Sequence, residues 1–225
     1  MNETPSERPI VLAITGASGA VYAARLLQVL LVKQRLVHLV ISQSGAAVVR
    51  QELGLGLNLD GSNLAELFQA SDRLLDTGDA GAATQQALDL AATGLLQVHH
   101  HQDYFTPIAS GSHLTAGMVI CPCSGSTLSG IARSASQNLI QRAAEVHLKE
   151  QRKLILVPRE TPLSVFQLEN MHRLAQAGVV ILPAAPGWYH GVTGLLDLVE
   201  FVVARILDQL GIENSQIHRW EDERA

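Results

Sequence analysis

The sequence predicts an α/β fold in which a mainly parallel central sheet is covered by helices on both faces. Short aliphatic runs alternate with segments of helical periodicity along the 225 residues. This alternation is the order of elements in a parallel sheet whose strands are joined by crossover helices. The runs are apolar at nearly every position rather than at every second one, as expected for strands buried on both faces.

The elements follow one another regularly. Residues 10–15, Ile-Val-Leu-Ala-Ile-Thr, form the first strand, and a Gly-Ala-Ser-Gly-Ala turn leads to a helical pattern at 21–34. Further apolar runs predict strands at 37–42, 117–123, 153–157 and 179–183. The remaining periodic segments predict helices at 44–53, 127–132, 139–152, 164–178 and 194–210. Residues 54–103 contain no clear strand, and we expect one helix there, near residues 84–93.

The chain length is typical of a single α/β domain. We place this domain at residues 10–212, between a flexible N-terminus (1–9) and a C-terminal tail (213–225). Hydrophobic residues make up 47% of the chain and charged residues only 16%, which argues against a disordered protein. No linker or internal repeat divides the sequence.

Charge and hydropathy limit the partners. The formal net charge of −5 argues against a general nucleic-acid binder. No apolar run reaches the ~18–20 residues that span a membrane. The N-terminus is polar and lacks the apolar stretch of a signal peptide, so we expect a cytoplasmic protein that does not associate with membranes.

Two sequence features resemble metal sites only superficially. Cys121 and Cys123 are separated by one residue, which suits neither a disulfide nor the usual metal-binding spacing. We expect both to be buried at the end of a strand. The contiguous histidines 99–101 lie in a polar stretch, where we expect a solvated loop. The sequence therefore predicts no metal site.

Small polar residues follow three of the predicted strands, at the edge where parallel sheets bind ligands. Gly16–Gly19 and Ser124–Thr127 each lead into a helix, whose unpaired N–H groups can bind an anion. Ser42 ends the second strand. Each serine can equally be a helix N-cap, so these loops alone indicate a phosphate site only weakly.

Charged residues give a stronger indication. Arg159 and Glu160 follow the strand at 153–157, just before a proline stops the extended run. An arginine there can hold an anion, and the adjacent carboxylate can transfer a proton. Arg142 and Lys149 are seven residues apart, about 20° around a helix axis and roughly 10 Å along it. They can hold one anion together, or belong to a solvated face with Glu145 and Glu150 as partners.

The order of these motifs resembles the flavin prenyltransferases of the UbiX type. The resemblance covers residues 10–53 and 104–220 and rests on these segments: Gly-Ala-Ser-Gly-Ala, Cys-Pro-Cys-Ser, Gln-Arg-Ala-Ala-Glu-Val-His-Leu-Lys-Glu, Val-Pro-Arg-Glu-Thr-Pro-Leu, Leu-Glu-Asn-Met and Pro-Gly-Trp-Tyr-His. It implies a Rossmann-like three-layer sandwich of the flavoprotein type that forms a homo-oligomer, dodecameric in the family.

The resemblance also implies an activity. These enzymes join a dimethylallyl group from dimethylallyl monophosphate to N5 and C6 of reduced FMN, without a metal. The product, prenylated FMN, is the cofactor of UbiD-type decarboxylases, in quinone biosynthesis or aromatic-acid breakdown.

By resemblance, each matching position takes the role of the family residue. FMN would contact Gly16, Ala17, Ser18, Ser42, Ser124, Gly125, Ser126, Thr127 and Arg159. The prenyl phosphate would contact Tyr104, Arg142, Lys149, Tyr189, Arg205 and Trp220, partly across subunit boundaries. Ser18, Glu52 and Glu160 match positions tied to proton handling or substrate orientation. Tyr104 stands where many members have tryptophan, which puts the prenyl-chain preference in doubt.

Two alternative functions remain open. An FMN-dependent cysteine decarboxylase has the same fold, but its Pro-Ala-Ser-Ala-Asn-Thr signature is missing here. A non-catalytic flavin carrier would bind FMN but would have no use for a second group of cations around a prenyl phosphate.

Overall fold

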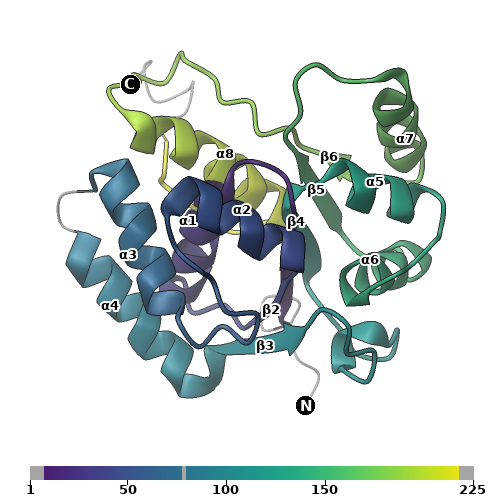
Figure 1. The fold of residues 1–225 in the computed structure, drawn as a ribbon, viewed down its shortest axis with the longest axis horizontal. Helices are drawn as coiled ribbons and strands as arrows, with labels where there is room; N and C mark the ends of the chain where they lie inside the picture. The colour runs from purple at the N-terminus through teal and green to yellow at the C-terminus, as the bar shows by residue number, and fades with distance from the viewer. Residues whose placement is uncertain (1–7, 78–79, 218–225) are drawn as a thin grey trace.

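The computed structural model describes residues 8–77 and 80–217. Within them, six parallel strands form one sheet in the order β3-β2-β1-β4-β5-β6 (Figure 1). The strands are β1 (Ile10–Ile14), β2 (Val37–Ile41), β3 (Leu96–His100), β4 (Gly117–Cys123), β5 (Leu154–Pro158) and β6 (Val180–Ile181). Strands β1, β2, β4 and β5 are buried at every position, as their aliphatic sequences predict.

Helices cover both faces of this sheet (Figure 1). One hydrophobic cluster joins the sheet to α1 (Ala20–Val32), α2 (Gln43–Leu53), α3 (Leu64–Leu75), α4 (Ala80–Leu90) and α8 (Leu195–Leu210). A second cluster, on the opposite face, joins it to the short helix η2 (Pro107–Ala109), α5 (Gly125–Ala132), α6 (Leu139–Lys149) and α7 (Val165–Gln176). The predicted three-layer α/β fold is confirmed.

Most predicted elements are present, with ends shifted by a few residues. The helix expected near residues 84–93 corresponds to α4, but the prediction for residues 54–103 missed α3, a π-helical turn η1 (Ala91–Leu95) and strand β3. Strand β3 is an edge strand whose residues are only half-buried or exposed. Its sequence, Leu-Gln-Val-His-His, therefore lacks the continuous apolar run by which the buried strands were found.

The ends of the chain are only partly described. Residues 1–7 and 218–225 lie outside the described residues. Most of the predicted flexible N-terminus (1–9) and Trp220 therefore fall outside the part of the chain that the structure describes. Among the described helices, none is both long enough and apolar enough to cross a membrane.

Candidate active site

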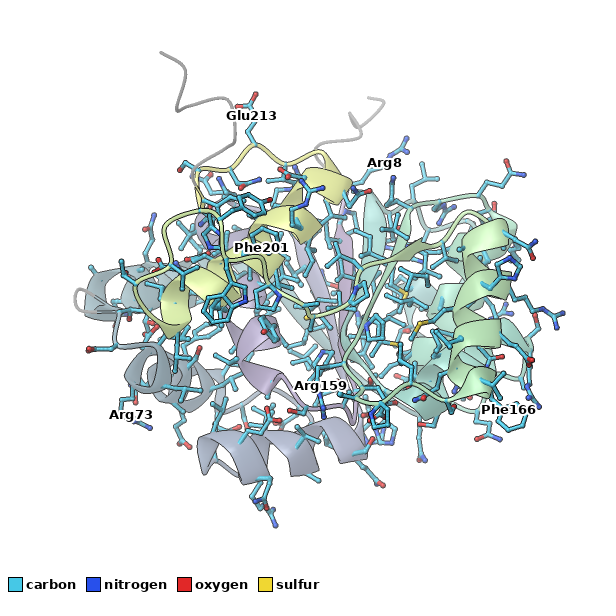
Figure 2. The ribbon with its side chains drawn as sticks, turned by 90° about the horizontal axis from the view of Figure 1, so that it is seen from above. Arg8, Arg73, Arg159, Phe166, Phe201 and Glu213 are labelled. Atoms are coloured by element: carbon cyan, nitrogen blue, oxygen red, sulfur yellow. The ribbon has the colours of Figure 1, made fainter. Side chains whose placement is uncertain are left out.

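The C-terminal edge of the sheet brings together four of the predicted polar segments. Strands β2, β1, β4 and β5 are neighbours in the sheet. The residues that follow them therefore meet at one edge: Ser42, Gly16–Ser18, Ser124–Thr127 and Arg159–Glu160. Figure 2 shows Arg159 on the side of the molecule opposite to Arg8, which precedes the first strand. Parallel α/β sheets bind ligands at this edge.

The first two loops at this edge pack tightly against each other. A Cβ atom on Gly16 would lie 2.5 Å from the Cβ of Ser44, and one on Gly45 would lie 2.6 Å from the carbonyl oxygen of Ile14. Any larger residue at either position would separate α2 from the end of β1. Ser42 is the N-cap of α2, and its hydroxyl accepts a hydrogen bond from the Gly45 N–H at 3.0 Å.

The N-terminus of α1 is bound by a carboxylate of the chain itself. Glu52, in the last turn of α2, accepts hydrogen bonds from the backbone N–H of Gly19 (3.0 Å) and of Ala20 (2.8 Å). These are among the backbone N–H groups that the sequence predicted to be available to an anionic ligand. Glu52 therefore fills the anion position at the start of α1. Ser18, directly before this position, is half-buried.

The N-terminus of α5 is rich in hydroxyl groups. Ser124 caps the helix by accepting from the Thr127 N–H at 3.3 Å, and its hydroxyl also lies 3.1 Å from that of Ser126. The Ser124 N–H in turn donates to the hydroxyl of Thr15 at 2.8 Å, which ties this loop to the end of β1. Ser124 is thus the N-cap of α5, while Ser126 is exposed.

Arg159 has unused hydrogen-bonding capacity at this edge. Its Nε atom is buried and has no hydrogen-bond partner within the described chain. At a ligand-binding edge, this N–H group is available to donate to an acceptor on a ligand. The adjacent Glu160 accepts a hydrogen bond from Gln167 Nε2 at 3.3 Å. Sequence reasoning missed Gln167, because the Ser164-x-x-Gln167 pattern indicates only a capping box, which is also present.

The remaining predicted cations lie elsewhere. Arg142 and Lys149 are on α6, where Arg142 Nε donates to the Ala109 carbonyl at 3.2 Å and Lys149 pairs with Glu150 at 2.5 Å. With Glu145, Leu148, Ser134 and Ala177 they line a pocket of about 440 Å³. Tyr104, in the loop that carries η2, is partly exposed. Arg142 and Lys149 do not belong to the strand-end group, whereas Tyr104 lies in the loop that follows β3, which ends at the same edge of the sheet.

The third group lies on the opposite face of the sheet, where α8 packs. Arg205 is exposed and forms an ion pair with Asp208 at 2.9 Å, as the sequence indicated. Tyr189 is exposed, with its ring edge-on to Phe201 at 5.9 Å between centroids. Arg205 and Tyr189 are therefore separated from Arg142 and Lys149 by the sheet within one chain (Figure 1).

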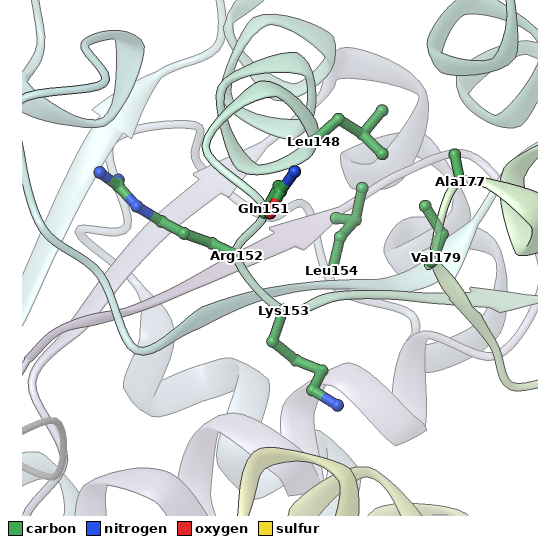
Figure 3. A pocket seen from close by; sticks show the side chains of 8 residues that line it. Leu148, Gln151, Arg152, Lys153, Leu154, Ala177 and Val179 are labelled. Carbon is green, nitrogen blue, oxygen red and sulfur yellow. The ribbon is translucent and has the colours of Figure 1, made fainter.

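A second pocket, of about 380 Å³, adjoins the α6 pocket at the N-terminal end of β5 (Figure 3). Leu148 and Ala177 line both. Figure 3 shows Arg152 pointing away from this pocket, and it donates to the carbonyl groups of His113 (2.7 Å) and Gly111 (2.5 Å). Its guanidinium thus holds a loop rather than a ligand.

The cysteines are buried, as predicted, and burial raises the pKa of both thiols, that of Cys123 to about 12. They are therefore not nucleophiles at neutral pH. The prediction of a solvated histidine loop was wrong, because His99 and His100 belong to β3 and His101 is buried. In the part of the chain that the structure describes, no group of three or more His, Cys, Asp or Glu residues could hold a metal ion.

Comparison with known proteins agrees with this architecture. Residues 1–207 match the Flavoprotein family, which places the chain among the flavoproteins. The flavin prenyltransferase UbiX of Halalkalibacterium halodurans is 46% identical over 213 residues, which cover 95% of this chain and 93% of the relative. The chain belongs to the flavin prenyltransferase family.

Solved structures support the same assignment. AnUbiX (PadA1), determined in complex with FMN and dimethylallyl pyrophosphate, has a TM-score of 0.75 and 33% identity, over 95% of this chain and 97% of that one. A dodecameric FMN-dependent UbiX-like decarboxylase from Escherichia coli O157:H7 has a TM-score of 0.73 and 36% identity, over 92% of this chain and 96% of that one. The similarity to the H. halodurans relative extends through residues 54–103, which the sequence motifs left out.

Proposed function

We propose that this protein is a flavin prenyltransferase that transfers a dimethylallyl group from dimethylallyl monophosphate to reduced FMN. The observation that carries the proposal is the 46% identity with a flavin prenyltransferase along 95% of the chain. The product, prenylated FMN, would pass to a UbiD-type decarboxylase. We further propose that the protein acts in the cytoplasm and that residues 10–212 form one flavin-binding domain.

The residues at the C-terminal edge fit FMN. Arg159 offers a buried N–H without a partner, and Ser126 offers an exposed hydroxyl at the N-terminus of α5. A flavin phosphate or ring carbonyl would satisfy these donors. The proposed FMN contacts are Gly16, Ala17, Ser18, Ser42, Ser124, Gly125, Ser126, Thr127 and Arg159. Reduced FMN supplies the nucleophilic ring positions that accept the prenyl group.

The chain itself supplies charge stabilisation and proton transfer. Arg142, Lys149 and Arg205, with the phenol of Tyr189, would bind the phosphate and stabilise the charge that grows on it as the prenyl group departs. Tyr104 and Trp220 would shelter the prenyl group with their aromatic faces. Glu160, held by Gln167, would transfer protons between phosphate and flavin, with Ser18 and Glu52 in orienting roles.

Assembly would complete this site. The cations on α6 and on α8 lie on opposite faces of the sheet, so one chain cannot close them around one phosphate. We propose a homo-oligomer, a dodecamer like that of the E. coli relative, in which neighbouring subunits contribute the missing side chains.

One experiment tests the proposal directly. Purified protein is incubated without oxygen with reduced FMN and dimethylallyl monophosphate, and the extracted flavin is analysed by mass spectrometry. We expect a mass gain of one C5H8 unit. Recovery of unmodified FMN from protein that binds it would overturn the proposal and favour the cysteine decarboxylase or the carrier.

A variant separates enzyme from carrier. Arg142→Ala should bind FMN normally but lose prenyl transfer by roughly 100-fold, as expected when a charged contact to the leaving group is removed. Arg173→Ala is the matched control, because Arg173 is exposed on α7. Equal turnover in the two variants would contradict the role of Arg142.

A further inference from the structure

The α6 pocket contains a charged residue that the proposed function does not use. Arg142, Glu145 and Lys149 stand at positions i, i+3 and i+7 of one helix and therefore share a face. All three line the pocket of about 440 Å³, together with Leu148, a size suited to a small ligand. The pocket thus contains two cations with a carboxylate between them.

The carboxylate of Glu145 has no partner among these cations. Its Oε1 atom is buried without a hydrogen bond. Lys149 pairs with Glu150, and Arg142 donates its Nε to the Ala109 carbonyl. A carboxylate oxygen that is buried without a donor costs free energy, and because Glu145 lines the pocket, a ligand bound there can supply a donor to this carboxylate. Because the terminal torsion of glutamate is soft, either carboxylate oxygen can face the ligand.

We infer that Glu145 accepts a hydrogen bond from a protonated phosphate group bound between Arg142 and Lys149. The inference rests on the proposed function and assigns this pocket a specificity-determining residue. A singly protonated phosphate ester complements these three side chains, since its unprotonated oxygens can accept from the two cations and its P–OH group can donate to the carboxylate. A fully deprotonated oxyanion would place lone pairs against lone pairs.

Inorganic phosphate and sulfate distinguish this arrangement from simple charge attraction. The two ions have nearly the same size, but sulfate has no proton to donate near neutral pH. A site built to accept a hydrogen bond rejects an analogue that lacks the donor, because its own polar group is then left unpaired. We expect the whole protein at pH 6 to bind phosphate about tenfold or more tightly than sulfate, as measured by calorimetry. The preference should persist at pH 8, because inorganic phosphate still carries one proton there while sulfate carries none.

The Glu145→Gln variant tests the residue itself. The amide can both donate and accept, so the preference for phosphate over sulfate should shrink to about threefold or less. Glu169→Gln is the matched control, because Glu169 is exposed on α7, and it should keep the wild-type ratio. A melting curve for each variant confirms that it is folded. If Glu145→Gln unfolds, the phosphate-to-sulfate ratio of the wild type still decides the matter.

Two results would overturn the inference: equal affinities for both ions in the wild type, or an unchanged ratio in Glu145→Gln. The second result is expected if Glu145 instead pairs with a cation of a neighbouring subunit. Because the binding measurement needs neither flavin nor turnover, its outcome is independent of the prenyl-transfer assay. Transfer without ion discrimination would refute only the role of Glu145, whereas discrimination without transfer would refute only the proposed activity.

Discussion

The carboxylate of Glu52 stabilises a helix other than its own. It belongs to the last turn of α2 but accepts hydrogen bonds from the backbone N–H groups of Gly19 and Ala20, at the start of α1. Gly19, the N-cap residue of α1, has a φ of 111°, a conformation that favours glycine. Because glycine has no side chain, no N-cap side chain hydrogen-bonds to the first turn of α1. Glu52 supplies the missing cap from 33 residues away.

Replacing Glu52 by alanine should therefore weaken the fold as well as the active site. We expect the free energy of unfolding to fall by about 1–2 kcal/mol, the usual effect of losing a cap together with a negative charge at a helix N-terminus. Urea denaturation measures this change. Gln51→Ala, at the exposed neighbouring position, is the control and should change stability little. Equal stability of the two variants would show that the contact contributes nothing.

At the residue scale, the sequence predicted the position of those polar residues that directly follow a strand. Arg159 and Glu160 were found because an apolar strand ends just before them, and the structure places them at the expected edge. The hydrogen bonds of Glu52 and Gln167 could not be found in this way. They depend on how α2 and α7 pack, and no local sequence pattern encodes the distance between two helices. Family resemblance, rather than spacing, singled out Glu52.

At the scale of elements, burial decides what the sequence reveals. The four central strands have continuous apolar sequences. In the edge strand β3, apolar and polar residues alternate and the last two residues are histidines. The polar residues of β3 serve its pairing with β2. His99 Nε2 lies 2.6 Å from Nδ1 of His38, which is buried within β2, and the ring of His113 lies edge-on to His38 at 5.2 Å between centroids.

This histidine contact predicts a dependence of stability on pH. Burial, together with the smaller effects of the neighbouring His99 and His113, lowers the pKa of His38 to about 4. The folded protein therefore binds fewer protons than the unfolded chain between pH 6.5 and 4. The stabilisation is complete above pH 6.5 and is lost as the pH falls through the folded-state pKa. We expect unfolding at pH 5 to require about 1–2 kcal/mol less than at pH 7 on account of His38.

His38→Gln tests this expectation, because the amide can still hydrogen-bond to His99 but does not titrate. Urea denaturation at pH 7 and pH 5 should show a smaller loss of stability in the variant than in the wild type. Some loss will remain, since burial also lowers the pKa of His147 to about 4. An identical loss in the two proteins would mean that His38 does not sense pH.

At the scale of the whole molecule, the sheet separates two sets of predicted phosphate ligands. Arg142 lies in the layer of α5, α6 and α7, while Arg205 lies on α8 in the opposite layer, exposed apart from its pair with Asp208 (Figure 1). A local motif identifies each cation, but the sequence of one chain does not reveal which of its surfaces contact each other in an oligomer. Symmetric oligomers place distant surfaces of one chain against each other, which would join the two sets.

Mixed oligomers test this arrangement. Homo-oligomers of Arg142→Ala and of Arg205→Ala should each lose prenyl transfer, because every site lacks one cation. If the two arginines of a site come from different subunits, equal co-expression leaves about a quarter of the sites with both, since each position is filled independently from two kinds of subunit. Turnover, measured as prenylated flavin formed per site, should recover to about that fraction of the wild-type value. If both arginines of a site came from one chain, no mixture could restore activity, because every subunit would carry one of the two substitutions.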